Sequence, residues 1–463
     1  MQAVAAGPVP AATSPLPPGP RTPRLLQSLS YALRPYATVE SARTWGDRYT
    51  IAALGTPGKM VVFSDPEAVR DIFNGDGDTL RAGEATGAIL GPLLGWHSLL
   101  VLDGERHLHE RRLMSPPFHG ERMHVYGRLM RDIAVRAIDR WPVGQPFPIH
   151  REMQAITLDV IIRAVFGVDQ EALFGPFRAQ VERFVSQVNG LSAPFIALRP
   201  FQVDLGRFSP WGRFVRNRQV IRDSVLAEIR RRRTDGVSQR TDIMSLLLEA
   251  RDENGEPMGD DELVDEMFTL LMAGHETTAT SLAWIVWHLL NHPEAMETLR
   301  REIADVTGGG PLEAQHLPRL EYLDAVIKES MRLTPVATMV ARRLHAPARI
   351  GGIDLPAGTS VGANIYMAHR RPDVWPDPER FDPTRFVGAR PNPFTFFPFG
   401  GGVRRCLGAA MATYEIKTVL PEILSRVDLR IAPGYRMRPV LRAVTIAPSR
   451  GMPVVVERRR EAQ

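Results

Sequence analysis

The sequence predicts a mainly helical protein with a smaller β region. Residues 120–250 carry apolar positions at the spacing of amphipathic helices. Residues 260–291 predict one long helix, about 48 Å in length, with Asp260 as its N-cap and its end before Pro293. Apolar stretches of β type complete the pattern, at 60–63, 336–340 and 441–446.

The composition is that of an ordinary globular chain. Of the 463 residues, 44% are apolar and 24% are charged, which is enough for a large buried core. The net charge of +5 is spread along the sequence, and the dense run Arg230–Arg233 predicts a solvated helix end, so no nucleic-acid partner is expected. The long helix is apolar nearly all round from 282 to 290, which predicts burial, and acids such as Asp265 exclude a membrane span.

The start of the chain differs from the rest. Its first 23 residues hold seven prolines and predict an extended, partly disordered lead-in, with the folded part at 24–463. There is no long apolar run, so neither a signal peptide nor a membrane anchor is expected. With one cysteine and no export signal, the expected location is the reducing cytoplasm.

Residues 24–80 predict a short helix and strands, and Asp65-Pro66-Glu67 predicts a helix start. Two irregular stretches follow later in the chain. The Gly-rich apolar stretch 81–102 then predicts a long loop, which is either a functional lid or a surface loop over the core. Residues 190–210 are the second irregular stretch.

The only cysteine, Cys406, lies in the stretch Phe-Gly-Gly-Gly-Val-Arg-Arg-Cys-Leu-Gly, residues 399–408. A helix predicted after Leu407 places Cys406 just before a helix N-terminus, where the dipole favours a thiolate. The glycines allow a tight turn beside a flat ligand, and Arg404 could pair with a carboxylate. The alternative is a buried structural cysteine after a Gly-rich turn.

A second motif, Ala-Gly-His-Glu-Thr-Thr, occupies residues 273–278 of the long helix. A His-Glu-x-x-His zinc site is excluded, because Ala279 stands where the second histidine is needed. The Thr277 hydroxyl can bond back to the carbonyl four residues earlier, and Glu276 beside it suggests proton delivery. The alternative is a self-satisfied threonine and a glutamate that points to the surface.

Together, these motifs resemble the haem loop and the central helix of the cytochromes P-450, and the likeness runs from about residue 40 to 456. The resemblance implies one domain of the cytochrome P-450 fold, with the long central helix over haem b. It makes Cys406 the axial ligand of the haem iron and Arg404 a propionate partner. It also places Phe399, Gly408 and Ala273 at the cofactor.

Further positions follow from the same resemblance. His107 and Arg111 share one face of a predicted helix, which is either a carboxylate clamp or a solvated polar face. The resemblance assigns both to one haem propionate. It assigns Arg342 to the propionates as well, with the adjacent Arg343 left open.

The pair Glu329 and Arg332 has a spacing that recurs at surface pairs elsewhere in the chain. The resemblance makes it part of a structural triad that supports the haem loop. Arg385 is the third member by its distance to Cys406, and Arg380 is the alternative.

The resemblance implies a haem-thiolate monooxygenase that inserts one oxygen atom from O2 into an apolar small molecule, with Glu276 and Thr277 delivering protons. Electrons are expected from a separate ferredoxin or flavodoxin with its reductase, docking near Arg405 and Arg112, and the protein is expected to be a monomer. The alternatives are a peroxide-driven haem-thiolate enzyme and a non-enzymatic haem or ligand carrier.

The sequence leaves the substrate open among a fatty acid, a terpenoid, a steroid and a macrolide-like compound. The two motifs resemble those of fatty-acid and broad-specificity bacterial members of the family. The side chains expected to line an apolar pocket are Ile89, Leu93, Leu94, Leu270, Ala273, Ala337, Met339, Val340 and Ile446, the last in a strand whose turn is expected to contact substrate.

Overall fold

The computed structural model describes residues 16–460, except residues 55, 57, 78, 119–121, 169–170, 190–195, 197–198 and 238–239. Its helices are α1 (Arg24–Leu33), α2 (Pro35–Ser41), α3 (Pro66–Asn74), α4 (Ala82–Leu94), α5 (Gly104–Met114), α6 (Arg122–Ile138), α7 (Ile149–Val160), α8 (Glu171–Asn189), α10 (Pro210–Asp235), α11 (Ile243–Glu249), α12 (Asp260–Asn291), α13 (Pro293–Thr307), α14 (Glu321–Leu333), α15 (Ile365–Ala368) and α16 (Ala409–Arg426). Its strands are β1 (Arg48–Ile51), β2 (Met60–Phe63), β3 (Leu80–Arg81), β4 (Pro146–Pro148), β5 (Met339–Leu344), β6 (Ala348–Ile350), β7 (Ile353–Leu355), β8 (Ser360–Asn364), β9 (Val427–Ile431), β10 (Pro439–Arg442), β11 (Thr445–Pro448) and β12 (Pro453–Arg459).

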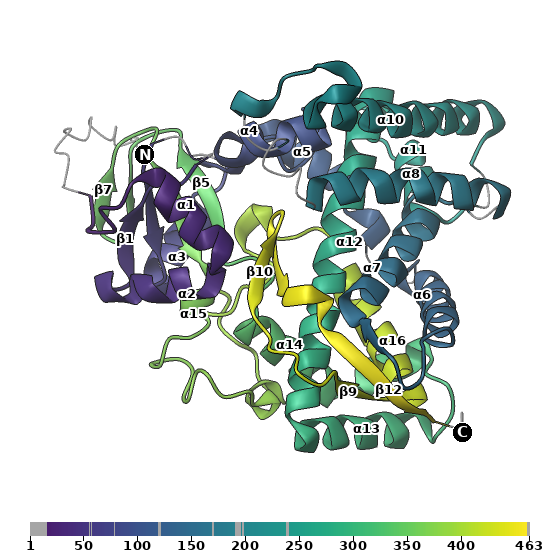
Figure 1. Cartoon of the computed structure of the whole chain (residues 1–463). Helices are drawn as coiled ribbons and strands as arrows, with labels where there is room; N and C mark the ends of the chain where they lie inside the picture. Colours follow the sequence, from purple (N-terminus) through teal and green to yellow (C-terminus); the bar gives the residue numbers. More distant parts are fainter. Residues whose placement is uncertain are drawn as a thin grey trace, which may run out of the picture.

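The long helix α12 passes through the helical part of the molecule, and other helices pack around it (Figure 1). It contacts α4, α7, α10, α14 and α16. Its middle is buried, and the Trp284 side chain is fully enclosed. The predicted extent of this helix and the burial of its middle are therefore confirmed. The burial follows because residues 282–290 are apolar nearly all round.

The largest sheet lies at the opposite side of the molecule from α8 and α10 (Figure 1). Its strand order is β1-β2-β8-β5-β3, with β2 and β8 parallel and the other pairs antiparallel. Strand β12 pairs with β4 and β9, while β10 and β11 form a separate hairpin. This hairpin lies between the large sheet and α12, and β11 contacts α12 (Figure 1).

The predicted loop at 81–102 is wrong in its first part, because Ala82–Leu94 forms α4. Packing overrides the low helix propensity of its glycines and proline. A Cβ at Gly83 would lie 2.2 Å from the Val101 carbonyl oxygen, so only glycine lets the helix approach this segment. The Asp103 carboxylate accepts hydrogen bonds from the Gly83 N–H at 2.9 Å and the next N–H at 2.8 Å, which satisfies the helix start.

Some predicted boundaries shift by a few residues. The N-cap of α12 is Gly259 instead of Asp260, because Glu262 Oε2 accepts a hydrogen bond from the Gly259 N–H at 2.9 Å. The chain bends from 336 to 338, so the extended segment expected at 336–340 begins only at Met339. The strand expected at 441–446 is divided by a turn whose Ala443 has a φ of 51°.

The helix start at Asp65 and the strand at 60–63 are confirmed. Residues 1–15 lie outside the described residues, as do 190–195 and 197–198 in the second irregular stretch. Residues 16–23 precede α1, and the Pro17 and Pro18 carbonyls accept hydrogen bonds from the Thr50 hydroxyl at 2.7 Å and the Thr50 N–H at 2.9 Å.

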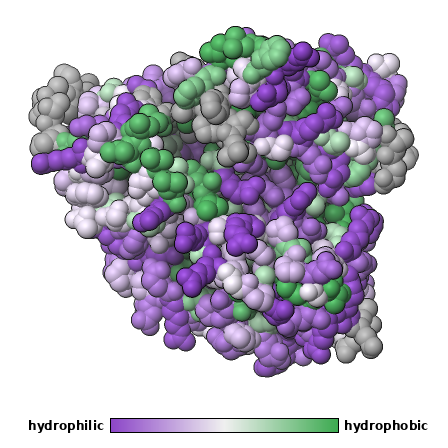
Figure 2. Space-filling model, in the orientation of Figure 1, coloured by the Kyte–Doolittle hydropathy of each residue, from purple (hydrophilic) through white to green (hydrophobic). Residues whose placement is uncertain are grey.

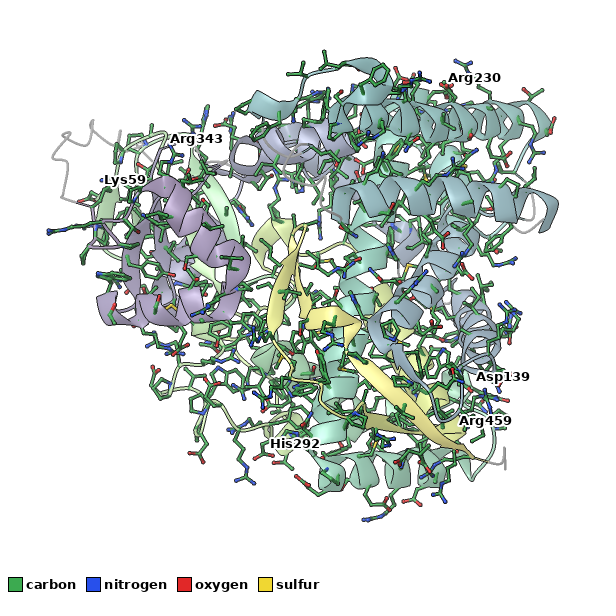
Figure 3. All side chains as sticks on the ribbon, viewed as in Figure 1. Lys59, Asp139, Arg230, His292, Arg343 and Arg459 are labelled. Carbon is green, nitrogen blue, oxygen red and sulfur yellow. The ribbon has the colours of Figure 1, made fainter. Side chains whose placement is uncertain are left out.

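The basic run Arg230–Arg233 forms the last turns of α10, with Arg230 on its outer side (Figure 3). Arg232 is only 2% exposed, so the predicted solvated end is wrong at this residue. Its guanidinium donates to Glu228 and Asp242 at 2.6 Å each. These carboxylates compensate for the burial of the charge.

Hydrophilic residues cover most of the face in Figure 2, with apolar areas over α1 and along the upper edge. α1 buries none of its residues, and Leu25, Leu26, Leu29 and Leu33 are exposed on it. Within the residues described, none of the helices combines the length and the apolar character that a membrane crossing requires.

Candidate active site

The loop around Cys406 is closed by its own backbone. The Cys406 N–H donates to the Phe399 carbonyl at 2.9 Å, and a short 3-10 turn spans Gly402–Arg404. Helix α16 starts at Ala409, after Leu407 as the sequence predicts, and Gly408 is its N-cap. Cys406 therefore stands immediately before a helix N-terminus.

The glycines of this loop make room for protein as well as for a ligand. A Cβ at Gly401 would lie 2.2 Å from the Phe73 ring, and one at Gly402 would lie 2.4 Å from the Phe73 carbonyl oxygen. Gly400 and Gly402 have φ values of 68° and 63°, which favour glycine. The loop is thus pressed against the end of α3, a contact that the sequence did not indicate.

The Cys406 side chain is exposed, yet the surrounding protein is close enough that burial raises the pKa of its thiol. A hydrogen bond from the Gly408 backbone and the charges of Arg111 and Arg405 act in the opposite direction and lower this pKa. Burial is the largest of these effects on the free thiol. The helix N-terminus and the two arginines supply the positive potential that an iron-bound thiolate requires.

Arg342 and Arg343 point to opposite sides of β5, because side chains alternate along a strand. Arg342 is 4% exposed and makes a bidentate ion pair with Asp76, whose carboxylate lies beside Gly402. Arg343 lies at the outer edge of the β region, away from α12 (Figure 3). The residue that faces the Cys406 loop is therefore Arg342.

Arg404 reaches from the Cys406 loop to the segment before α5. Its guanidinium pairs with the Asp103 carboxylate and donates to the carbonyls of Leu99 (3.1 Å) and Leu102. Burial and neighbouring arginines lower the pKa of Arg404 to about 10, while Asp103 raises it. Arg404 stays cationic at neutral pH.

His107 and Arg111 lie on α5, close enough to the same arginines to be affected by their charges. Burial, and then the charges of Arg404, Arg111 and Arg342, lower the pKa of His107 to about 3, so it is neutral at neutral pH. Arg111, Arg342 and Arg404 form a cationic cluster. It also contains two carboxylates, those of Asp76 and Asp103. One positive charge is left in excess.

That excess charge fits a haem, whose two propionates are anionic. The haem would be held by Cys406 through its iron, and its propionates would lie toward the cationic cluster. The two carboxylates, Asp76 and Asp103, were missed from the sequence. Their signal was weak, because an isolated aspartate in a turn carries no motif.

On α12, the open face carries Ala273, which is exposed, and Thr277, which is half-buried. The Thr277 hydroxyl donates to the Ala273 carbonyl at 2.6 Å, the back-bond that the sequence predicts. Leu270 is half-buried, one turn earlier on the helix. The small side chains of this face leave space for a flat group.

Glu276 is 5% exposed, so the alternative of a surface glutamate is wrong. Its Oε2 accepts hydrogen bonds from Gln154 Nε2 at 2.6 Å and Asn189 Nδ2 at 3.0 Å. Burial raises the pKa of Glu276, while the hydrogen bond from Gln154 and the charge of Arg442 lower it. These partners come from α7, α8 and β10, and no sequence pattern linked them to the motif.

The structure brings Glu329, Arg332 and Arg385 together. Glu329 and Arg332 are fully buried and joined by two hydrogen bonds of 2.7 and 2.8 Å. Arg385 Nε lies 3.4 Å from Glu329 Oε1. Arg380 is exposed and contributes only its backbone carbonyl, to Arg332 at 3.2 Å, so Arg385 occupies the third position.

The expected substrate pocket is corrected at Leu93, Leu94 and Ile446, which are 7%, 3% and 0% exposed. Leu93 and Leu94 pack in the helical core, and Ile446 is held by a hydrogen bond from Trp284 Nε1 to its carbonyl at 2.8 Å. These side chains build the core instead of lining a pocket. The others keep some exposure: Ile89, Leu270, Ala273, Ala337, Met339 and Val340.

A family model described as Cytochrome P450 matches residues 16–454 of the chain. The chain belongs to the cytochrome P450 family. It is accordingly a P450 monooxygenase with haem b as its cofactor, and the P450 fold implies an apolar substrate and a redox partner. The expected family, fold and cofactor are confirmed.

Curated relatives align with almost the whole length of this P450. Cytochrome P450 135B1 of Mycobacterium bovis is 38% identical over 452 residues, which cover 96% of this chain and 92% of the relative. Cytochrome P450 135A1 of Mycobacterium tuberculosis is 36% identical, with 95% and 94% covered. The cyanobacterial CYP120A1, solved with retinoic acid bound, superposes with a TM-score of 0.82 at 26% identity and covers 96% of this chain and 99% of that one.

Proposed function

We propose that this P450 inserts one oxygen atom from O2 into an apolar small molecule, with Cys406 as the axial ligand of its haem. The observation that carries this proposal is the single cysteine, exposed just before α16 and beside a cluster with excess positive charge. When bound, the haem supplies the reductive activation of dioxygen. The protein holds the cofactor, orients the substrate and delivers protons.

His107, Arg111, Arg342 and Arg404 are the proposed partners of the propionates. Asp76 and Asp103 orient two of these arginines through ion pairs. Ala273, Phe399 and Gly408 complete the contacts with the cofactor. Glu329, Arg332 and Arg385 are the proposed structural triad that supports the Cys406 loop, and they take no part in the chemistry.

Glu276 and Thr277 are the proposed proton relay. The Thr277 hydroxyl donates its proton to the Ala273 carbonyl, so its oxygen lone pairs are free to accept a hydrogen bond from water. Glu276 is buried and carries a raised pKa, which brings its proton affinity toward the range that suits a general acid.

The proposed substrate is a fatty acid, a terpenoid, a steroid or a macrolide-like compound. Support comes from the partly exposed apolar side chains of α4, α12 and β5, among them Ile89, Leu270 and Val340. The retinoic acid bound by CYP120A1 is an elongated apolar molecule, which agrees with this class. Displacement of iron-bound water, followed by the haem absorption band, would rank these compounds as ligands.

A separate ferredoxin or flavodoxin, with its reductase, is the proposed electron donor. Arg405 is exposed beside Cys406, and Arg112 is exposed with a loose 3.5 Å ion pair to Glu253. Charge reversal at both arginines should slow the reduction and flatten its salt dependence. An unchanged rate and salt dependence would refute this docking site. The monomeric state and the cytoplasmic location stay predictions.

Replacement of the single cysteine tests the proposal directly. We expect Cys406→Ala to lose the thiolate-type carbon monoxide spectrum, whereas Glu276→Gln keeps that spectrum but loses product formation relative to NADH consumption. A thiolate-type spectrum in Cys406→Ala would overturn the assignment. Turnover with peroxide alone would instead indicate the peroxide-driven alternative, and ligand binding without any turnover would indicate a carrier.

A further inference from the structure

Buried polar atoms without a hydrogen-bond partner converge on one side of Glu276. Among the described residues, Glu276 Oε1 and Arg442 Nε are such atoms, whereas His150 Nε2, which also approaches Glu276, is hydrogen-bonded to the Thr280 hydroxyl at 3.1 Å. Glu276 Oε1 lies 3.7 Å from His150 Nε2 and 3.7 Å from Arg442 Nε. The other carboxylate oxygen is already held by two amides, so the unpartnered oxygen faces the two basic side chains.

The β10–β11 hairpin determines the position of Arg442. It is the last residue of β10, directly before the turn at Ala443, and β11 returns along α12. The hydrogen bond from Trp284 Nε1 to the Ile446 carbonyl anchors this hairpin to the same helix that carries Glu276. The Arg442 side chain remains 34% exposed, so it links the buried carboxylate to the surface of the hairpin.

We infer that Arg442 is a positioning residue for the proton relay, orienting the Glu276 carboxylate from the β10–β11 hairpin. This inference rests on the proposed role of Glu276 as the relay acid. Arg442 acts through Glu276 and touches neither substrate nor cofactor in this role.

The charged and titratable groups around Glu276 support this assignment. His150 approaches from α7, and His275 precedes Glu276 on α12. Burial lowers the pKa of His150 to about 3 and that of His275 to about 4, and Arg442 contributes to the first shift. Both histidines are therefore neutral at neutral pH. The neighbours Gln154 and Asn189 are uncharged, which leaves Arg442 as the cation that opposes the effect of burial on Glu276.

Loss of this cation should leave Glu276 protonated up to a higher pH. The test is an infrared pH titration of the haem-loaded full chain, which follows the carbonyl stretch of protonated carboxyl groups. The band that disappears in Glu276→Gln belongs to Glu276. In Arg442→Gln we expect its midpoint to move to higher pH, with about a tenfold change in proton affinity for each unit of movement.

Two further variants make the test specific. Arg442→Lys restores a cation and should return the midpoint toward that of the wild type. Arg438→Gln removes an exposed arginine from the segment before β10, without a contact to Glu276, and should leave the midpoint unchanged. The inference is overturned if the titration midpoint of Glu276 is the same in Arg442→Gln as in the wild type. It is also overturned if neither the wild type nor Arg442→Gln shows an infrared band that belongs to Glu276.

The outcome is distinguishable from a failure of the relay itself. If Glu276→Gln keeps wild-type product yield, Glu276 is no relay acid, whatever Arg442 does to its titration. If the midpoint is unmoved while Glu276→Gln loses product, the relay stands and Arg442 has no part in it. With both effects present, the pH profile of product yield should shift in Arg442→Gln in the same direction as the infrared midpoint.

Discussion

Glu415 offers a sharp test of how burial acts in this fold. It lies on α16, nine residues after Cys406, and is 2% exposed. Its Oε1 has no hydrogen-bond partner among the described residues, and burial alone raises its pKa from 4.5 to about 8. The folded protein therefore keeps Glu415 protonated at a pH where the unfolded chain has already lost the proton.

This difference should make the protein less stable as the pH rises. Below pH 4.5 both states are protonated, and Glu415 has no effect through ionisation. Between pH 4.5 and about 8 only the unfolded state ionises, so the free energy of unfolding falls by about 1.4 kcal/mol per pH unit. The full loss is about 5 kcal/mol at pH 8 and about 3 kcal/mol at pH 7.

Glu415→Gln removes the titration and keeps the shape of the side chain. Relative to the wild type, we expect the variant to gain about 3 to 4 kcal/mol on going from pH 5 to pH 8. The measurement is urea unfolding of the haem-loaded protein at both pH values, followed by circular dichroism. The prediction uses only how the difference in unfolding free energy between variant and wild type changes from pH 5 to pH 8. A pH-independent cost of burying the glutamine amide therefore cancels.

Glu422→Gln on the same helix is the contrasting variant. Glu422 is also buried, but it accepts hydrogen bonds from Arg131 at 2.8 Å and Arg426 at 2.9 Å. Its replacement breaks ion pairs and should destabilise the protein at neutral pH. If the difference between Glu415→Gln and wild type were the same at pH 5 and pH 8, the reasoning about burial would be refuted.

Two further predictions concern the support of the Cys406 loop. Arg332→Ala leaves Glu329 as an unpaired buried charge and should lower the unfolding free energy by about 3 to 5 kcal/mol. Arg380→Ala, at an exposed residue, should change it by less than about 0.5 kcal/mol. Equal effects of the two variants in urea unfolding would contradict the triad. Gly401→Ala should lower haem retention, because its Cβ would lie 2.2 Å from the Phe73 ring. Gly175→Ala on α8 meets nothing within 4 Å and should retain haem normally; equal retention by both would contradict the packing argument.

Local sequence patterns were sufficient to predict features that depend on the residues of a single segment. The burial of α12 follows from residues 282–290, which are apolar nearly all round, and its end follows from Pro293. The Cys406 loop was identified because a rare combination of residues is contiguous in sequence. The start of α16 at Ala409 was equally visible in the run of helix-forming residues that follows Leu407.

Other features depended on contacts between distant segments, which a local pattern does not contain. The residues at 82–94 are poor helix formers, yet they form α4 because Gly83 packs against Val101. Ile446 looked like a pocket residue, but the hydrogen bond from Trp284 holds it in the core. The surroundings of Glu276 come from three separate elements.

The motif letters alone predicted the family and the cofactor and suggested the relay pair, because the chemistry of a haem thiolate constrains a few neighbouring residues strongly. Which arginine faces the loop, which one completes the triad and what surrounds Glu276 were decided by tertiary packing. The physical reason is that charge and burial act through space. An arginine at 442 affects a carboxylate at 276 only after the chain has folded to bring their side chains within 3.7 Å.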